Sequence, residues 1–179
     1  MQDTLPIHFA PLQGYTEAIY RNAHDAFFGG VDTYYTPFVR LEKGNFRRRD
    51  VRGIEPENNG VTHLIPQLIA SSAEKAEVIL SLFIEKGYQE VDINLGCPFP
   101  LLAKRHNGSG ILPYPEEVKA LLSIVTRYPQ ISFSVKMRLG WEQPDECLAL
   151  APILNDLPLR QITMHPRLGK QGYKGEVDL

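Results

Sequence analysis

Cysteine is scarce in this chain, which holds only Cys97 and Cys147 among its 179 residues. The two cysteines form no CxxC or other metal-ligand spacing, and one possible pair cannot build a disulfide framework. The sequence also has no secretory apolar region and no apolar run long enough to span a bilayer. We therefore expect a cytoplasmic protein with no metal site, no disulfide framework and no membrane association.

An excess of charge of one sign is also missing, because the formal net charge is only −2. No general attraction to nucleic acid or membrane follows, so any site for a polyanion must be local. The sequence contains no GxGxxG, P-loop or HExxH pattern, which disfavours a nicotinamide Rossmann domain and an ATPase. A hydrophobic content of 43% is ordinary for a globular domain with a sizeable core.

Short apolar segments alternate with helical patterns along the whole chain. Strands are predicted over 6–12, 33–36, 61–68, 91–95, 131–137 and 161–164. Helices are predicted over 16–28, from the Ser71–Glu74 capping box to Gly87, from Pro115 onwards and over 144–155. In the first helix, we expect Ile19, Ala23, Ala26 and Phe27 to share one face, and we expect residues 41–60 to form a long loop.

This order is typical of an α/β protein whose parallel sheet is covered by helices. About six β/α units fit the chain, whereas a closed (β/α)8 barrel of the TIM type needs eight units and typically about 250 residues. The sequence therefore predicts an incomplete TIM-type barrel, with an open edge unless another copy or a further segment covers it.

Polar side chains fall where the predicted strands end. Gln67, Asn94–Cys97, Lys136–Arg138 and His165–Arg167 each follow a strand at its carboxyl end. In a barrel these ends meet at one mouth, where active sites are built. We therefore expect the four groups to face a shared site.

Cys97 lies in a Gly-Cys-Pro turn just beyond the fourth strand. An ordinary thiol pKa of about 8.5 keeps it mostly protonated at neutral pH, so it could donate a proton without special activation. The alternative is a small, inert apolar side chain, which is our interpretation of Cys147.

Lys136, His165 and Gln67 each have a functional and a structural interpretation. Lys136 would suit the negative charge of a reduced flavin ring, or it could reach solvent at a strand end. His165 could bind a cofactor carbonyl or phosphate, although taken alone a satisfied core histidine is favoured. Gln67 could bond a ring edge, or it could be a buried amide bonded to backbone.

The polar segment after the second strand carries Arg47, Arg48, Arg49 and Arg52. These guanidinium groups could contact phosphates at the same mouth as Cys97. The alternative is a solvated loop, in which Glu42 and Asp50 offset part of the charge.

Together these residues resemble the dihydrouridine synthase family, which are flavoenzymes that reduce uridine in tRNA. The segments that carry the resemblance are Ala10-Pro11-Leu12-Gln13-Gly14, Gln67-Leu68, Asp92-Ile93-Asn94-Leu95-Gly96-Cys97-Pro98, Asn107-Gly108-Ser109-Gly110, Val135-Lys136-Met137-Arg138-Leu139-Gly140-Trp141 and Ile162-Thr163-Met164-His165-Pro166-Arg167. The Asn-x-Gly-Cys-Pro and Lys-x-Arg-Leu-Gly-Trp pieces are specific, and the others support them. At Pro166 the family often has a small residue, and we expect only a local change there.

The resemblance implies an FMN-binding (β/α)8 barrel followed by a helical domain that helps to hold tRNA. By this comparison, residues 1–179 are the N-terminal part of the flavin-binding barrel. The last two β/α units, which bind the FMN phosphate in the family, and the C-terminal helical domain are absent from the sequence.

The resemblance also implies roles for individual residues. Pro11, Leu12 and Gln13 would lie against the flavin, and Gln67, Lys136 and His165 would contact FMN. Cys97 would be the catalytic proton donor, and Asn94 and Arg167 would lie near the flavin and the target base.

The implied reaction converts specific uridines in tRNA to 5,6-dihydrouridine. NADPH reduces FMN, a hydride passes from reduced FMN to uracil C6, and Cys97 protonates C5. Two alternatives remain open. The chain could be a dihydroorotate-dehydrogenase-like flavin oxidoreductase acting on a free pyrimidine, or an inactive fragment that does not hold FMN. The sequence indicates neither the oligomeric state nor the tRNA position modified.

Overall fold

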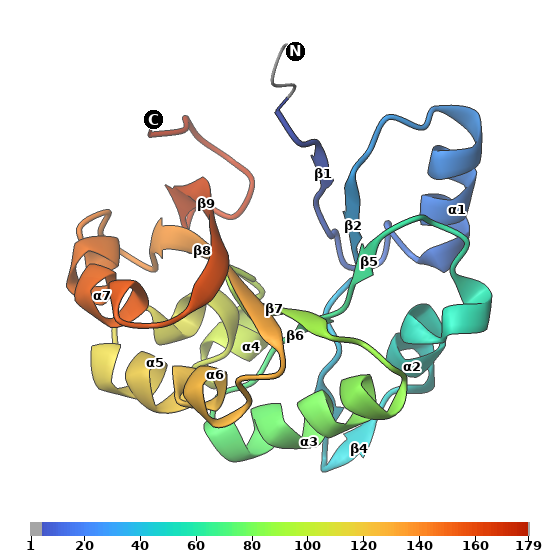
Figure 1. Ribbon diagram of the computed structural model, residues 1–179. Coiled ribbons are helices and arrows are strands. Elements are labelled where there is room, and N and C mark those ends of the chain that lie inside the picture. Colours follow the sequence, from blue (N-terminus) through green and yellow to red (C-terminus); the bar gives the residue numbers. More distant parts are fainter. Residues whose placement is uncertain (1–4, 179) are drawn as a thin grey trace.

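A computed structural model describes residues 5–178 of the chain as an α/β structure (Figure 1). Its strands are β1 (His8–Phe9), β2 (Thr33–Tyr35), β3 (Leu41–Glu42), β4 (Asn45–Phe46), β5 (Leu64–Ile65), β6 (Gln67–Leu68), β7 (Glu90–Leu95), β8 (Ser132–Gly140) and β9 (Leu159–Leu168). Its α-helices are α1 (Ala18–Phe27), α2 (Arg48–Ile54), α3 (Ala73–Glu85), α4 (Pro100–Ala103), α5 (Pro115–Leu122), α6 (Ile124–Arg127) and α7 (Glu146–Asn155). Two 3₁₀ turns, η1 and η2, cover Pro56–Asn58 and Gly108–Ile111.

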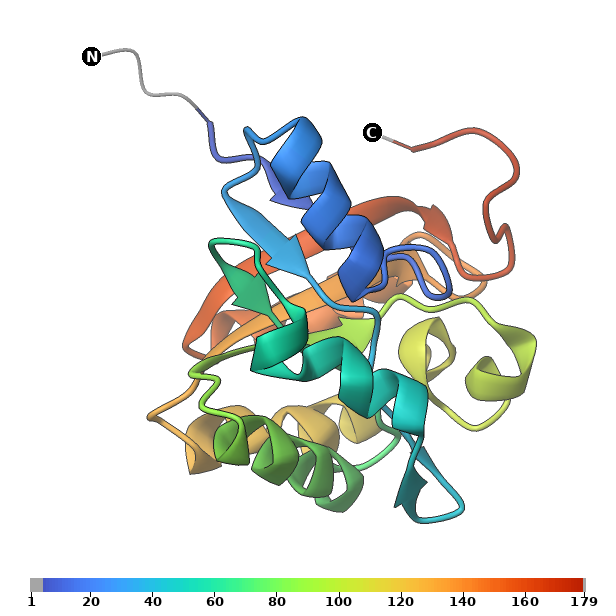
Figure 2. The same cartoon turned by 90° about the vertical axis from the view of Figure 1, so that its right-hand side faces the viewer.

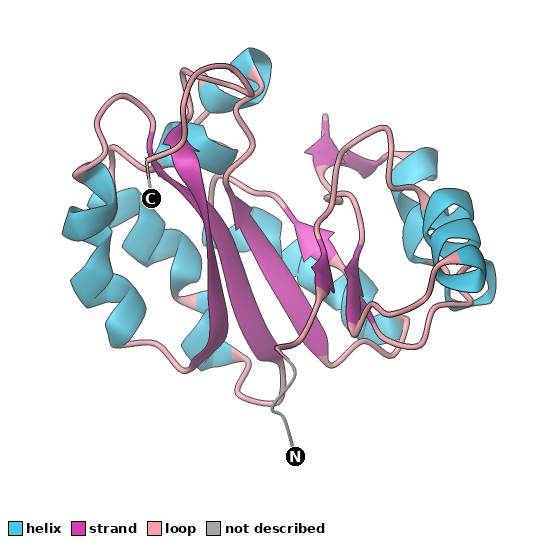
Figure 3. Cartoon of the chain, turned by 90° about the horizontal axis from the view of Figure 1, so that it is seen from above, coloured by secondary structure: helices cyan, strands magenta, loops and turns pink. Residues whose placement is uncertain are grey.

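The principal strands are all parallel and follow the order of the sequence. One sheet has the order β1-β2-β5 and the other β6-β7-β8-β9, and an isolated parallel bridge between Val39 and Leu68 joins them. The strands form a curved array with most helices on its convex side (Figure 3). In the part of the chain that the structure describes, β1 and β9 do not pair, so no closed barrel is formed.

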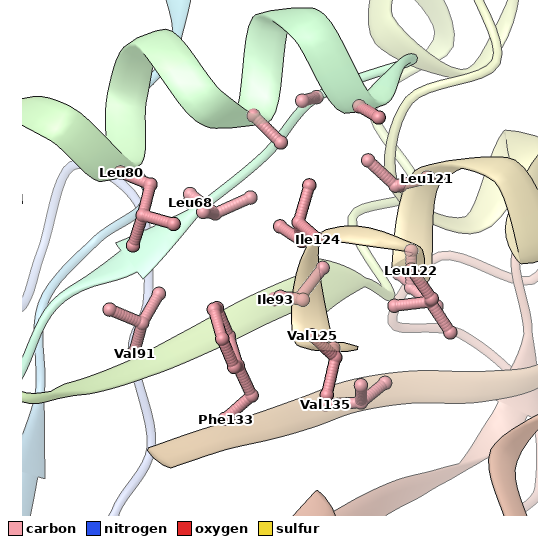
Figure 4. Close-up of a cluster of buried hydrophobic side chains, with 14 of the residues drawn as sticks. Leu68, Leu80, Val91, Ile93, Leu121, Leu122, Ile124, Val125, Phe133 and Val135 are labelled. Atoms are coloured by element: carbon pink, nitrogen blue, oxygen red, sulfur yellow. The ribbon is translucent and has the colours of Figure 1, made fainter. Parts of the chain in front are cut away.

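The main core fills the space between the helices and the convex face of β6, β7 and β8. Figure 4 shows Leu80 of α3 near Val91 of β7, and Leu121 and Leu122 of α5 on the side of Ile93 of β7 and Val135 of β8. These six side chains are fully buried. Burying such a side chain stabilises the fold by roughly 1.5–3 kcal/mol, so this layer anchors the strands that carry the polar residues on the opposite face.

Side chains that alternate with the core residues face the concave side of the array. Asp92 and Asn94 alternate with Ile93 on β7, and Lys136 alternates with Val135 on β8. The register pairs Asn94 with Lys136, so these two side chains come from neighbouring positions of adjacent strands. The strand period of two therefore separates an apolar outer face from a polar inner one.

Several elements confirm the sequence-based expectations. Ser72 caps α3, because its hydroxyl accepts a hydrogen bond from the Lys75 amide at 3.5 Å. The predicted apolar stripe of α3 is buried. The helix ends before Gly87, which adopts a φ of +84° that favours glycine.

The prediction of a long loop over 41–60 is wrong. The segment contains the β3–β4 hairpin, α2 and η1, with Lys43 and Gly44 at positive φ in the hairpin turn. Arg47 immediately precedes α2 and donates two hydrogen bonds to Asp50 in its first turn, at 2.9 and 2.6 Å. This charged pair stabilises a short helix that has no apolar periodicity.

The predicted inner face of the first helix is also wrong. Ile19 and Phe27 are 82% and 84% exposed, whereas Ala18 and Arg21 are buried. The Arg21 guanidinium donates to the carbonyl oxygens of Thr16 and Gly53, at 2.6 and 2.8 Å, and thereby ties α1 to α2. Figure 2 shows these two helices, blue and teal, side by side on the β2 and β5 side of the molecule.

Strand boundaries differ from the prediction in several places. The strand expected over 6–12 is reduced to the two residues of β1, His8–Phe9. The single strand expected over 61–68 is divided at Pro66 into β5 and β6, which belong to different sheets. Proline cannot donate a ladder hydrogen bond, which explains the break. β8 and β9 run on to Gly140 and Leu168, beyond their predicted ends. No helix in residues 5–178 is long and apolar enough to cross a membrane.

Candidate functional site

The carboxyl ends of the strands surround a cavity of about 390 Å³. It is lined by most of the residues that the sequence analysis singled out: Pro11, Leu12, Gln13, Gln67, Asn94, Cys97, Lys136 and His165. Further lining residues are Ala10, Thr16, Pro37, Phe38, Gly96, Pro98, Arg138 and Tyr173. Side chains from β6, β7, β8 and β9 and from the segment after β1 are therefore brought together at one end of the array.

The Cys97 turn is held from both sides. The Asn94 side-chain oxygen accepts hydrogen bonds from the Gly96 and Cys97 amides, at 3.0 and 2.8 Å. The Cys97 carbonyl oxygen accepts from the amide and the hydroxyl of Ser109, at 3.0 and 2.9 Å. Burial raises the pKa of the Cys97 thiol, so the group is protonated at neutral pH.

Close packing against the Cys97 turn explains the glycine in the Gly-Ser-Gly segment, residues 108–110. Gly108 has a φ of +60°, and a Cβ there would lie 2.6 Å from the Cys97 carbonyl oxygen. Only glycine allows this backbone conformation together with so close an approach. The motif therefore supports the position of Cys97.

Arg138 is a functional candidate to which the sequence analysis assigned no separate role. Its side chain is buried and donates to the carbonyl oxygens of Gly96 and Leu168, both at 2.9 Å. Its guanidinium carbon lies 5.5 Å from the centre of the Tyr173 ring. Arg138 thus links the Cys97 turn to the end of β9. Its place two residues after Lys136 on one strand was the available signal, because such residues share a face.

Lys136 and Gln13 bring unpartnered polar groups to the cavity. Within residues 5–178, the Lys136 ammonium makes no hydrogen bond or ion pair, and both polar atoms of the Gln13 amide are buried without a hydrogen-bond partner. Burial lowers the pKa of Lys136, although nearby Asp92 acts in the opposite direction. Buried polar groups in native proteins normally have partners, so the two Gln13 atoms point to a polar ligand.

His165 is held in its neutral form. Burial, followed by the charges of Arg138, Lys136 and Arg167, lowers its pKa to about 4. Arg167 lies 3.2 Å from His165 Nε2, and because a guanidinium can only donate, Nε2 accepts and Nδ1 carries the proton. Arg167 itself does not line the cavity and reaches it only through His165.

Gln67 is bonded to side chains rather than to the backbone. Its amide nitrogen donates to Asp92 at 2.6 Å, and its amide oxygen accepts from Asn94 at 2.7 Å. The other Asp92 oxygen accepts from the Ser134 hydroxyl at 2.6 Å. The sequence analysis gave Asp92 no role, although its strand spacing from Asn94 already placed both on one face.

A second cavity of about 810 Å³ adjoins the first and shares Cys97, Leu12, Gln13 and Tyr173 with it. Its wall includes the aromatic side chains of Tyr15, Phe38, Phe99 and Trp141 and the cations Arg40, Arg47 and Lys170. Apolar surface thus lies beside the thiol, and the three cations are ion-paired to Glu42, Asp50 and Glu142 respectively.

Two of the four arginines in the predicted cluster, Arg47 and Arg49, form ion pairs. Arg47 is paired with Asp50 at 2.6 Å, and Arg49 lies 3.9 Å from Glu17. Of the cluster, Arg47 alone is among the residues that line the second cavity. No group of three or more His, Cys, Asp or Glu side chains in the described part of the chain is arranged to hold a metal ion.

Comparison with known proteins agrees with this geometry. The sequence profile of the family described as "Dihydrouridine synthase (Dus)" matches residues 8–179. The chain is 29% identical over 175 residues to the probable tRNA-dihydrouridine synthase 1 of Synechocystis sp., covering 94% of this chain and 47% of that protein. It is 28% identical over 180 residues to the tRNA-dihydrouridine(16) synthase of Haemophilus ducreyi, covering 95% of this chain and 54% of the relative.

A third relative, tRNA-dihydrouridine synthase B of Vibrio cholerae, is 32% identical over 114 residues, which are 63% of this chain and 33% of that protein. The chain spans about half the length of the relatives that it matches over most of its own length. Because the profile covers nearly the whole sequence, the chain belongs to the dihydrouridine synthase family.

Proposed function

We propose that this chain forms the flavin-binding part of an FMN-dependent enzyme that reduces specific uridines in tRNA to 5,6-dihydrouridine, with NADPH as the electron donor. We also infer that its strands are six β/α units of an open (β/α)8 barrel, as their parallel order and the helices on the convex side support. The observation that carries the proposal is the convergence of Cys97 and Lys136 on one cavity.

The residues around the cavity fit a flavin ring. A volume of about 390 Å³ lies in the range of small-molecule sites, and the lone Lys136 ammonium and the unpartnered Gln13 amide would meet the polar edge of the ring. Gln67 and His165 also line this wall. When bound, reduced FMN supplies the hydride that saturates the C5=C6 bond of uracil.

Cys97 would complete the reduction by protonating uracil C5. Its raised pKa keeps the proton on sulfur at neutral pH, as a general acid requires. The second cavity offers aromatic walls for an extruded base and cations for the adjoining phosphates. Asn94 and Arg167 would lie beside the flavin and the base, at the β7 and β9 sides of the site respectively.

Replacement of Cys97 by alanine tests the proton-donor role. General acids typically contribute 10²- to 10⁴-fold, so Cys97→Ala should slow single-turnover oxidation of the NADPH-reduced protein by unmodified tRNA by about 100-fold or more. Cys147→Ala removes the other thiol, which lies on α7 and lines neither cavity, and should leave the rate unchanged. Equal rates in the two variants would show that Cys97 is not the donor.

The same preparation tests the function as a whole. Reoxidation by orotate instead of tRNA would favour a dihydroorotate-dehydrogenase-like enzyme. A purified chain that neither carries the flavin absorption band nor takes up added FMN would favour an inactive fragment. Either result would contradict the proposal.

A further inference from the structure

We propose that Asp92 is a positioning residue that sets the orientation of the Gln67 and Asn94 amides and, through them, holds the Cys97 turn. The role of this arrangement in catalysis rests on the proposed function, but the chain of hydrogen bonds is a feature of the protein alone. It runs from β7 to β6, back to β7, and on to the backbone of the turn.

The donor and the acceptor of every hydrogen bond in this series follow from the groups at its two ends. The amides of Gly96 and Cys97 can only donate, so Asn94 must present its oxygen to them. The Asn94 nitrogen then faces Gln67, which must present its own oxygen at 2.7 Å. The Gln67 nitrogen therefore faces position 92 at 2.6 Å, where only an acceptor is compatible.

A carboxylate at position 92 provides this acceptor. One Asp92 oxygen accepts from Gln67, and the other accepts from the Ser134 hydroxyl at 2.6 Å. Burial raises the pKa of Asp92, although the hydrogen bonds from Ser134 and Gln67 act in the opposite direction. The oxygen that faces Gln67 can accept in either protonation state, because a proton on the other oxygen can be donated to the Ser134 hydroxyl oxygen. Asp92 thus supports, from one end, the direction that the backbone amides set at the other.

Burial fixes the orientation of the Gln67 and Asn94 amides. Asp92, Gln67 and Asn94 are only 2%, 1% and 8% exposed, so solvent is not available to satisfy a reversed amide. Reversal of either amide would set two donors against each other within 3 Å and leave buried groups unsatisfied. The acceptor at position 92 therefore favours the orientation in which the Asn94 oxygen reaches the Cys97 turn.

This arrangement also defines what Asn94 can do. Its oxygen accepts two hydrogen bonds from the turn, and one of its two N–H groups is used by Gln67. One N–H therefore remains for a ligand in the cavity that Asn94 lines. Asn94 can position the thiol and still donate a single hydrogen bond to a bound molecule.

Asp92→Leu tests the proposal, because it keeps a side chain of similar size and removes the acceptor that faces the Gln67 nitrogen. The amide protons of Gly96 and Cys97 should then exchange with solvent on the order of tenfold faster, because Gln67 loses its acceptor and no longer holds the orientation of Asn94. The exchange is measured by NMR on the flavin-free 179-residue chain. In a Cys147→Ser background, the pH profile of Cys97 alkylation should also shift.

Asp92→Asn is the matched conservative variant. Its amide oxygen can accept from Gln67 while its nitrogen donates to the Ser134 hydroxyl oxygen, so the direction of the hydrogen bonds is kept without the charge. We expect exchange of Gly96 and Cys97 to stay near the wild-type rate in this variant. A role that needs the negative charge itself would make Asp92→Asn behave as Asp92→Leu does.

Ser134→Ala serves as the control, because it removes the other hydrogen bond to Asp92 without reversing any amide. It should leave exchange at Gly96 and Cys97 near the wild-type rate. The proposal is overturned if Asp92→Leu leaves these amides as protected as in the wild type, if Ser134→Ala exposes them equally, or if Asp92→Asn exposes them as Asp92→Leu does.

These outcomes are separate from those of the proposed function. Exchange and alkylation need neither flavin nor tRNA, so unchanged protection in Asp92→Leu would reject the positioning role even in an active enzyme. The expected pattern of exchange in a chain that forms no dihydrouridine would reject only the reaction.

Discussion

At the scale of single residues, the backbone of Gly108 decides how closely the Gly-Ser-Gly segment can approach Cys97. Gly108 and Gly172 have nearly the same φ, +60° and +59°, but an added Cβ would meet Cys97 atoms at 2.6–2.9 Å in the first case and nothing within 4 Å in the second. Alanine in this left-handed region costs about 1–2 kcal/mol at either position. Only Gly108→Ala adds steric overlap with the turn.

Gly108→Ala should therefore lower the free energy of unfolding by about 1–3 kcal/mol more than Gly172→Ala does, which is the usual cost of overpacking. Chemical denaturation of the two variants measures the difference. Equal losses would mean that the Cys97 turn yields to the added methyl group without cost.

His165 makes the stability of the chain sensitive to mild acid. Its folded-state pKa is about 4, below the ordinary 6.5, so the unfolded chain binds a proton in this window and the folded chain does not. Stability therefore falls as the pH drops from about 6.5 toward about 4. In His165→Gln this contribution is lost, and the melting temperature should decline less steeply over the same window. Parallel pH dependences of the two proteins would contradict the shift.

At the scale of elements, α2 depends on one charged pair. The Asp50 side chain is 2% exposed and accepts both hydrogen bonds from Arg47, whereas the Arg40–Glu42 pair lies at 3.6 Å with Glu42 56% exposed. Hydrogen bonds to charged groups contribute about 1.5–3 kcal/mol, so Asp50→Asn should destabilise the fold by roughly that amount.

Glu42→Gln is the matched control for Asp50→Asn, since exposed ion pairs contribute only about 0–1 kcal/mol. Denaturant titration with far-ultraviolet circular dichroism reports both changes. If the two substitutions cost the same, the Arg47–Asp50 pair does not stabilise α2.

The elements also show why parts of the site could be predicted from the sequence. The convergence of four site residues could be predicted from the assignment of four parallel strands alone, because the carboxyl ends of such strands share one side of a sheet. These residues are Gln67, Asn94, Lys136 and His165. The role of Asp92 needed the register that sets Gln67 opposite it, and apolar periodicity gives no register between strands. α2 was missed because a charged pair, rather than an apolar stripe, stabilises it.

The buried face of α1 was predicted wrongly for a related reason. The buried side of this helix is occupied by Arg21, whose two terminal guanidinium nitrogens donate to Thr16, just before the helix, and to Gly53 and Asn59, more than 30 residues away. A prediction from apolar periodicity assigns charged residues to the exposed face of a helix. It therefore placed Ile19 on the buried face, although Ile19 is 82% exposed. Tertiary hydrogen bonding, which the local sequence does not contain, decided the orientation of α1.

At the scale of the whole molecule, the strand array ends in two unpaired edges, β1 and β9. Ile162 of β9 lies in register with Val135 of β8, yet Val135 is fully buried and Ile162 is 42% exposed. Met164 on the same strand is 40% exposed. An apolar strand with an open hydrogen-bonding edge is a ready template for pairing with another chain.

The 179-residue chain should therefore associate with itself in a concentration-dependent manner, and a charge on this strand should oppose that association. In sedimentation velocity, Ile162→Lys should shift the distribution toward monomer. Leu148→Lys is the matched control, because Leu148 is 70% exposed on α7 and lies on no strand edge. If both substitutions act equally, general hydrophobicity drives association. If the unsubstituted chain stays monomeric throughout, the β9 edge is not a pairing surface, and the curvature of the array is enough to protect it.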